Sequence, residues 1–170
     1  MTIHNHRRQA VQSVKCKIIT ISDTRTKEND KSGRMMKEYL EGAVHEVLNY
    51  TIIKDEQSAI EEAVKEGINN PEIEAILTNG GTGIAPRDVT IEVVESLYDK
   101  HIPGFGELFR MLSYTEDIGS ASLLSRASAG IVGKTAVFST PGSSGAVKLA
   151  MTQLILPELG HVTAEMKKKE

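Results

Sequence analysis

Apolar runs of strand length alternate along this chain with segments of helical periodicity, and this alternation restricts the fold more than any other feature. Residues 14–21, 47–53 and 75–78 are short apolar runs rich in β-branched side chains, and we interpret them as strands. The segments after them repeat their apolar residues every three or four positions, which predicts helices. Successive strand-helix units favour a parallel sheet covered on both faces, so the predicted fold class is α/β, doubly wound.

The second half of the chain departs from this alternation. Two strands are predicted around Gly133 and Lys134, a two-residue connection with glycine first that suits a hairpin turn, so a small antiparallel hairpin should join the sheet. A last helix is predicted through Ile155 and should end near Pro157. The remaining predicted elements are short helices at 107–113 and 122–128, and the hairpin strands themselves at 129–132 and 135–139.

Length and composition indicate one domain. The chain has 170 residues, of which 39% are hydrophobic, and this suffices for a core of its own. We assign residues 14–165 to that domain, residues 1–13 to a flexible arm and residues 166–170 to a basic tail. No run approaches the roughly 20 apolar residues that a bilayer requires, and no leader is recognisable, so we predict a cytoplasmic protein with no membrane partner.

Charge and residue usage exclude several classes of function. A net charge of -3 gives no basic field for a nucleic-acid backbone. The aromatic content of 4% and the absence of Trp disfavour a carbohydrate groove or a base-stacking platform. Cys16, the single cysteine, cannot form an internal disulfide, and we interpret it as a buried packing residue. Any ligand should therefore be held by backbone groups and small polar side chains.

Four loops are expected at the carboxyl ends of strands, where open α/β sheets bind their ligands. Two of them combine glycine and hydroxyl residues ahead of a helix, which aims free backbone N–H groups at phosphate. The group Gly80, Gly81, Thr82 and Gly83 matches neither a Walker A nor a Rossmann fingerprint, and a tight turn is the alternative interpretation. The four loops are residues 22–33, 54–57, 79–88 and 140–145.

Acidic residues fall on the same rim. Asp23, Asp55 and Asp88 each follow a predicted strand, although Asp55 and Asp88 could instead cap helices, an interaction worth about 1 kcal/mol. Ser143 and Ser144 likewise fit either an anion-binding loop or a helix cap. Because Mg²⁺ prefers carboxylate oxygens together with substrate phosphates, acids beside phosphate-type loops indicate metal-assisted phosphoryl chemistry.

An apolar set in residues 102–113 predicts self-association. Its members recur at roughly helical spacing after a Pro-Gly bend, and five on one short element exceed what the monomer core should absorb, so we expect a second copy to cover the remainder. Complete burial within one chain is the alternative. The set consists of Ile102, Phe105, Leu108, Phe109 and Leu112.

Seven short motifs in a fixed order carry a family resemblance. They are Ser22-Asp23-Thr24, Asp30-Lys31-Ser32-Gly33, Thr78-Asn79-Gly80-Gly81-Thr82-Gly83, Pro86-Arg87-Asp88-Val89-Thr90, Pro103-Gly104-Phe105-Gly106-Glu107, Leu124-Ser125-Arg126-Ala127 and Pro141-Gly142-Ser143-Ser144. In these motifs the chain resembles the molybdopterin-binding family, and within it the B-type proteins related to molybdopterin adenylyltransferase and to the G domains of gephyrin-like proteins. The resemblance extends over residues 14–165.

The resemblance implies a trimer or hexamer that takes part in molybdenum cofactor biosynthesis with other proteins of that process. In active relatives, ATP and Mg²⁺ adenylylate the terminal phosphate of molybdopterin and pyrophosphate is released. Carried onto this sequence, the catalytic acids and Mg²⁺ ligands are Asp55 and Asp88, the nucleotide-binding residues are Asp23, Ser32, Gly80, Gly81, Thr82 and Gly83, and the molybdopterin-binding residues are Ser113, Pro141, Gly142, Ser143 and Ser144.

Two departures from the adenylyltransferase pattern keep other functions open. Lys54 stands before Asp55 where adenylyltransferases commonly have proline, and Ser143-Ser144 replaces an Asn/Gln-Pro pair. Both differences are typical of B-type sequences. A noncatalytic molybdopterin-binding scaffold is therefore the alternative to an enzyme. A nucleotide pyrophosphate hydrolase is disfavoured, because those relatives usually carry a further domain.

Overall fold

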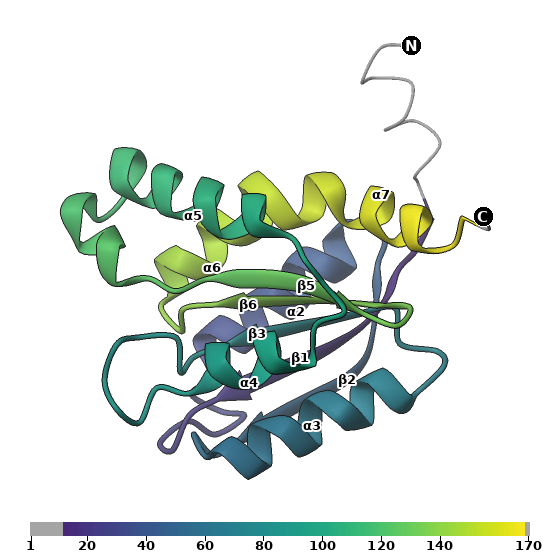
Figure 1. Ribbon diagram of the computed structural model, residues 1–170, viewed down its shortest axis with the longest axis horizontal. Helices are drawn as coiled ribbons and strands as arrows, with labels where there is room; N and C mark the ends of the chain where they lie inside the picture. The colour runs from purple at the N-terminus through teal and green to yellow at the C-terminus, as the bar shows by residue number, and fades with distance from the viewer. Residues whose placement is uncertain (1–11, 169–170) are drawn as a thin grey trace.

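The computed structural model describes residues 12–168, which form one six-stranded sheet with helices on both faces (Figure 1). The proposed arm at residues 1–13 therefore lies almost entirely outside the described residues, as does the end of the proposed tail. In chain order the elements are β1 (Lys15–Ile21), α2 (Lys31–Gly42), β2 (Glu46–Ile53), α3 (Gln57–Asn69), β3 (Ala75–Asn79), α4 (Thr90–Leu97), β4 (Lys100–His101), α5 (Pro103–Glu116), the 3₁₀ helix η1 (Gly119–Leu124), β5 (Ser128–Val132), β6 (Thr135–Thr140), α6 (Ser144–Ala150), a π-helical turn (Met151–Ile155) and α7 (Leu156–Met166).

The sheet has the strand order β2-β1-β3-β6-β5-β4. Strands β2, β1, β3 and β6 run parallel, whereas β5 pairs antiparallel with both β6 and β4. The predicted parallel sheet and its added hairpin are thus confirmed, and the two-residue strand β4 extends the antiparallel edge. Because β1 lies between β2 and β3, the chain reverses its direction of winding there, and open α/β sheets bind ligands beside such a point.

Each face of the sheet packs against its own hydrophobic cluster. Ile18 of β1 belongs to the cluster that contains residues of α2, α5, α6 and α7, and its neighbour Ile19 belongs to the cluster with α3 and α4. In β3, Leu77 belongs to the first of these clusters and Ile76 to the second. Successive strand residues point to opposite faces, so a strand covered on both sides is apolar throughout, which explains the continuous apolar runs of the sequence.

Cys16 is fully buried in β1, which confirms its interpretation as a packing residue. Burial, with a smaller contribution from the charge of Glu74, raises the pKa of the Cys16 thiol to about 12. Since the thiolate is the reactive form of cysteine, this residue stays inert at neutral pH.

The prediction that the last helix ends near Pro157 is wrong. Helical backbone continues from α6 through the turn Met151–Ile155 into α7. Proline inside a helix clashes with the carbonyl four residues earlier, but Pro157 occupies the first turn of α7, directly after a wider π-helical turn. No helix within residues 12–168, this one included, is long and apolar enough to cross a membrane.

Helix α5 divides the apolar set predicted to mediate association. Phe105 and Phe109 are buried, with ring centroids 6.5 Å apart, and Phe105 also meets Phe138 edge-on at 5.4 Å. Both phenylalanines therefore belong to the monomer core. Leu108 and Met111 are 47% and 53% exposed and form part of an uncovered apolar face. The helix also starts earlier than predicted, because proline is tolerated in a first turn.

Candidate functional site

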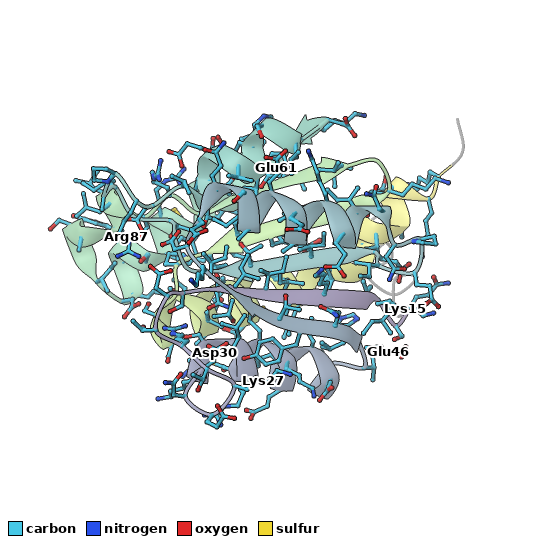
Figure 2. All side chains as sticks on the ribbon, turned by 90° about the horizontal axis from the view of Figure 1, so that it is seen from below. Lys15, Lys27, Asp30, Glu46, Glu61 and Arg87 are labelled. Atoms are coloured by element: carbon cyan, nitrogen blue, oxygen red, sulfur yellow. The ribbon has the colours of Figure 1, made fainter. Side chains whose placement is uncertain are left out.

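All four predicted ligand loops lie at one end of the sheet, because they follow the parallel strands β1, β2, β3 and β6. Figure 2 shows Arg87 and Asp30 toward this end, and Lys15 and Glu46, which begin β1 and β2, toward the opposite end. The loops after β1 and β3 flank the point where the winding direction reverses. The candidate site is therefore centred where these two strands end.

The β3–α4 loop, residues 80–89, turns sharply across the end of β1. Gly80 and Gly81 have φ angles of +103° and +66°, which L side chains rarely adopt. A Cβ on Gly80 would also clash with the carbonyl oxygen of Ile21. Thr90 closes the turn, because its hydroxyl donates to the Gly80 carbonyl at 3.0 Å and its N–H to the Gly81 carbonyl at 3.1 Å. Two of the glycines are thus required by the turn itself.

Gly83 has a different role, since its missing side chain makes room for Asp88. A Cβ on Gly83 would lie 2.6 Å from Asp88 Oδ2, and the same oxygen accepts a hydrogen bond from the Ala85 N–H at 3.0 Å. Asp88 does not cap a helix: the N-cap position of α4 is Val89, which makes no side-chain cap bond. The carboxylate of Asp88 instead lies against its own loop.

Asp55 lies beside the same loop and is incompletely satisfied. It does not cap α3, whose N-cap position is Glu56. Its Oδ1 is buried, has no hydrogen-bond partner among the described residues and would lie 3.0 Å from a Cβ on Gly81. Burial, followed by the charge of Asp88, raises the pKa of the Asp55 carboxyl. This combination favours a cation close to both carboxylates.

Magnesium suits this arrangement better than a metal that needs an all-protein cage. Within residues 12–168, no group of three or more His, Cys, Asp or Glu side chains could hold a metal ion. Mg²⁺ is commonly bound by one or two carboxylates, with waters and substrate phosphates completing its shell. Asp55 and Asp88 could supply the carboxylates, so these residues fit the predicted Mg²⁺.

Asp23 links Asp55 to Arg87, the residue before Asp88. One of its carboxylate oxygens accepts a hydrogen bond from the Asp55 N–H at 3.0 Å, and the other pairs with the Arg87 guanidinium. Both partners of the Asp23–Arg87 pair are partly exposed, so solvent or a ligand can compete for this contact. The resemblance implies that Asp23 contacts the nucleotide. The nucleotide would then share the Asp23 carboxylate with Arg87 or take the place of Arg87 there.

The β6–α6 loop, residues 141–143, touches the β3–α4 loop directly. The Gly80 N–H donates to the Thr140 carbonyl at 3.0 Å, and a Cβ on Gly142 would lie 3.3 Å from the Gly80 Cα. Ser143 caps α6, because its hydroxyl accepts from the Ala146 N–H at 3.2 Å. The cap interpretation is thus correct for Ser143. Two loops of phosphate-binding composition adjoin one another, which would place two anions close together.

Arg25, which no motif of the sequence singles out, fastens the β6–α6 loop to the neighbouring strand ends. Its Nη2 donates to the Gly142 carbonyl at 2.7 Å, and its Nη1 lies 3.3 Å from Asn79 Oδ1 and 3.4 Å from Asp30 Oδ1. The buried Ser32 hydroxyl donates to the same Gly142 carbonyl at 2.7 Å. Ser32, predicted to contact nucleotide, thus supports the adjoining loop in this structure.

Asp30 is the buried anion that orients Arg25. It caps α2 by accepting from the Gly33 N–H at 3.0 Å, and it also accepts from the Tyr50 hydroxyl. Burial, the largest single effect, favours the neutral acid, but hydrogen bonds from Thr20, Tyr50 and Gly33 and the charge of Arg25 outweigh it and hold the Asp30 pKa below its usual value. Asp30 is therefore ionised at neutral pH.

Ser113 is buried in α5. Its carbonyl accepts hydrogen bonds from the Asp117 and Ile118 N–H groups at the end of that helix, and the Asp117 carboxylate lies about 3.3 Å from where a Cβ on Gly145 would be. The end of α5 thus lies beside the first turn of α6. The contact of Ser113 with molybdopterin stays a prediction.

Comparisons with known proteins identify the family of this chain. The family described as "Probable molybdopterin binding domain" matches residues 17–161. Molybdenum cofactor biosynthesis protein B of Bacillus subtilis (strain 168) is 58% identical over 168 residues, which cover 99% of each chain. A crystal structure of a molybdenum cofactor biosynthesis protein B, also 58% identical, superposes with a TM-score of 0.91 over 93% of this chain and 98% of that one.

A more distant relative has the same fold. The tungsten cofactor synthesizing protein MoaB from Pyrococcus furiosus is 37% identical, with a TM-score of 0.80 over 92% of this chain and 99% of that chain. These matches confirm the family resemblance of the seven motifs. The chain therefore belongs to the molybdopterin-binding domain family and, within it, to the group of molybdenum cofactor biosynthesis protein B.

Proposed function

We propose that this protein acts in molybdenum cofactor biosynthesis by transferring an adenylyl group from ATP to molybdopterin. The family and the names of its relatives support the role in cofactor synthesis. The observation that carries the proposed reaction is the pair of Asp55 and Asp88, in which a buried carboxylate oxygen without a partner lies next to a glycine-rich loop. A scaffold that only binds molybdopterin has no need for such a pair.

The proposed reaction exchanges one phosphoanhydride bond for another. An oxygen of the molybdopterin phosphate forms a bond to the α-phosphorus of ATP, and the bond from that phosphorus to the bridging oxygen of the β-phosphate breaks. The electron pair leaves with pyrophosphate. Because the attacking phosphate is already an anion, no general base is needed, and the protein has to align two anions and offset their repulsion.

The residues of the four loops divide this task. Backbone N–H groups in residues 81–83 would face the phosphates of ATP, and the adjoining β6–α6 loop would hold molybdopterin near the start of α6. Asp55 and Asp88 would hold Mg²⁺. When bound, Mg²⁺ supplies positive charge that stabilises the transferring phosphoryl group and the departing pyrophosphate.

The direct test is to incubate the purified protein with ATP, Mg²⁺ and molybdopterin and to measure adenylylated product together with pyrophosphate. We expect both to form in equal amounts and to stop when EDTA removes Mg²⁺. Glu38→Gln, which changes an exposed acid on α2, is the matched control and should behave as the unmodified protein does. Tight molybdopterin binding without product would favour the scaffold, and AMP released from a free dinucleotide would favour the hydrolase.

We also propose that the protein assembles as a trimer or hexamer through the exposed face of α5 and η1. Leu108→Asp or Met111→Asp should give smaller, folded species by light scattering, because a charge on this face opposes association. Phe109→Asp should unfold the chain, since it places an unpaired charge in the core. If the unmodified protein is a monomer across micromolar concentrations, the proposed assembly is wrong. The exposed face consists of Leu108, Met111, Tyr114, Ile118, Leu123 and Leu124.

A further inference from the structure

The β3–α4 loop forms few hydrogen bonds of its own. Within residues 82–88, the only bond between backbone groups runs from the Asp88 N–H to the Ala85 carbonyl at 2.9 Å. The tip of the loop, residues 84–87, is exposed, and the three glycines before it, Gly80, Gly81 and Gly83, offer no side chain to anchor the loop. Contacts with another part of the molecule must therefore fix its shape.

Arg126, just after η1, makes these contacts. Its Nε donates to the Gly83 carbonyl at 2.9 Å and also lies 3.3 Å from the Thr82 carbonyl oxygen. Its Nη2 donates to the Asp88 carbonyl at 2.9 Å. A single guanidinium thus joins the segment that leaves β3 to the segment that enters α4. Such a planar fork of donors is a property of arginine that lysine does not share.

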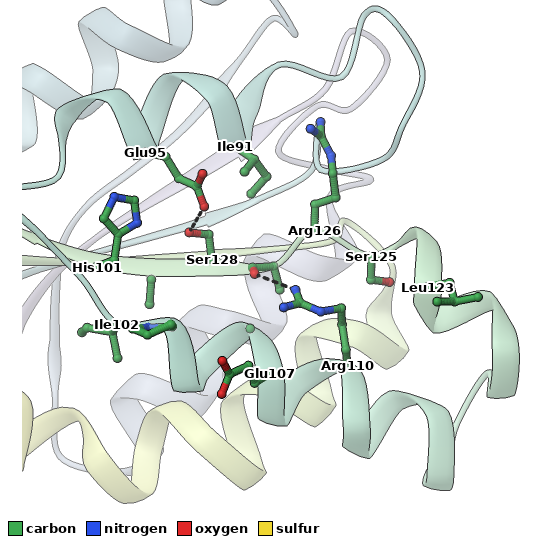
Figure 3. Close-up of a pocket in the computed structure, with 14 residues that line it drawn as sticks. Ile91, Glu95, His101, Ile102, Glu107, Arg110, Leu123, Ser125, Arg126 and Ser128 are labelled. Carbon is green, nitrogen blue, oxygen red and sulfur yellow. Dashed lines mark hydrogen bonds between the residues drawn. The ribbon is translucent and has the colours of Figure 1, made fainter.

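Glu92 of α4 holds the guanidinium in place. Its carboxylate pairs with Nη1 of Arg126, and its second oxygen accepts from Nη2 at 3.2 Å. Figure 3 shows that Arg126 points away from Arg110, the other arginine that lines the same cavity of about 490 Å³. Arg110 donates to the Ala127 carbonyl at 3.3 Å, which lies outside the β3–α4 loop. The two arginines share a cavity but only Arg126 holds the loop.

We propose that Arg126 is a positioning residue that sets the place of the Asp88 carboxylate relative to Asp55. The Asp88 side chain lies over Gly83, and Arg126 binds the carbonyls of both residues, so a shift of either segment moves this carboxylate. Arg126 would then act on the Mg²⁺ and nucleotide side of the site without touching either ligand. The consequence for catalysis rests on the proposed function, but the effect on the loop does not.

The first test is hydrogen exchange of the full chain, which needs no ligand and no activity. Arg126→Met should raise amide exchange at the hydrogen-bonded N–H groups of this loop, those of Gly80, Ala85 and Asp88, by about tenfold or more, because the opening of a segment depends on the contacts that hold it. Arg110→Met is the matched control and should leave this segment unchanged. Equal exchange in the two variants would overturn the proposal.

The second test separates the two substrates. Arg126→Met should lower kcat/KM for ATP by about 10- to 100-fold, since small displacements of a catalytic group cause losses of this size. The Kd of molybdopterin should stay within about twofold. Arg126→Lys should resemble Arg126→Met if the fork matters, and methylguanidinium added to Arg126→Ala should restore part of the ATP activity. Full activity of Arg126→Lys would show that only the positive charge of Arg126 matters. This result would overturn the proposal that Arg126 positions the loop.

The third test asks whether Arg126 acts through Asp88. Mn²⁺ affinity in the presence of a nonhydrolysable ATP analogue should fall in Arg126→Met and in Asp88→Asn, and the double variant should be no worse than Asp88→Asn. If the losses of Mn²⁺ affinity in the two single variants add up in the double variant, Arg126 does not act through Asp88. If the unmodified protein forms no adenylylated product, the proposed function fails, whereas hydrogen exchange still decides the role of Arg126.

Discussion

Two loops form the candidate site, and each is held by an arginine from a distant part of the sequence. The β3–α4 loop, residues 80–89, is bound by Arg126 and enters a helix that has no side-chain cap. The β6–α6 loop has only residues 141–143, is bound by Arg25 and enters a helix that Ser143 caps. Arg126 is thus the one side chain that binds carbonyls on both sides of the long loop, whereas Arg25 and Ser32 both donate to the Gly142 carbonyl of the short loop.

The loops also differ in charge. The long loop carries Asp88 and lies beside Asp55, and in the proposed function these carboxylates would attract a cation and, with it, a nucleotide. The short loop contains no ionisable side chain and offers backbone groups and hydroxyls. We infer a division of labour in which the long loop supplies the chemistry and the short loop holds the acceptor. Changes in the two loops should therefore affect different substrates.

Asp88→Asn should lower adenylyl transfer by about 10²–10³-fold, the usual loss when one preorganised electrostatic contact to a reacting group is removed. The melting temperature should not change, because the Asn side-chain oxygen can still accept from the Ala85 N–H. Product formation and thermal unfolding are to be measured on the same preparation, with Glu38→Gln as control. Turnover equal to that of the unmodified protein would remove Asp88 from the mechanism.

Arg25→Met should weaken molybdopterin binding by about tenfold and leave the Kd of ATP unchanged. The loss corresponds to about 1.4 kcal/mol, within the range of one hydrogen bond to a charged group. Calorimetric titration with each ligand measures this difference. Ser32→Ala, which removes the second donor to the Gly142 carbonyl, should have a smaller effect in the same direction. An equal loss of both ligands would show that the loops do not act separately.

Asp55→Asn should raise the melting temperature at neutral pH while it abolishes transfer. The Asp55 pKa is raised in the folded chain, so stability falls as the pH rises through that pKa and stays lower above it. Asparagine does not ionise, so the variant does not lose stability as the pH rises. The gain in melting temperature should vanish below the usual pKa of an aspartate. Mg²⁺ should make the difference in melting temperature between the two proteins smaller, because it stabilises the unmodified protein. A gain that is independent of pH would contradict this account.

Local patterns in the sequence predict most of the sheet and the position of the site. The strand runs, the hairpin at Gly133 and the four loops follow from periodicity and glycine placement, and the structure confirms them. Patterns fail where packing decides. Helical backbone continues past Pro157, and the apolar residues of α5 divide between the core and the surface. Sequence spacing alone does not reveal which side of a helix is covered.

The arginines that hold the loops lie beyond such patterns. Arg25 reaches a carbonyl 117 residues away, and nothing in the sequence distinguishes it from the neighbouring Lys27. Arg126 lies in a motif that carries the family resemblance, yet its contacts with a loop 43 residues earlier appear only in the fold. That Asp55 Oδ1 is buried without a hydrogen-bond partner among the described residues is likewise seen only in the fold.

The amino-acid sequence determines where strands and helices form and at which end of the sheet the acids and glycines gather, because periodicity and turn chemistry act between near neighbours. Tertiary structure determines which polar groups find partners and which remain free to bind a cation or a phosphate. Burial and hydrogen bonding between distant segments exist only once the sheet has assembled. In this protein they distinguish Ser143, which caps a helix, from Asp55, whose buried oxygen has no partner among the described residues.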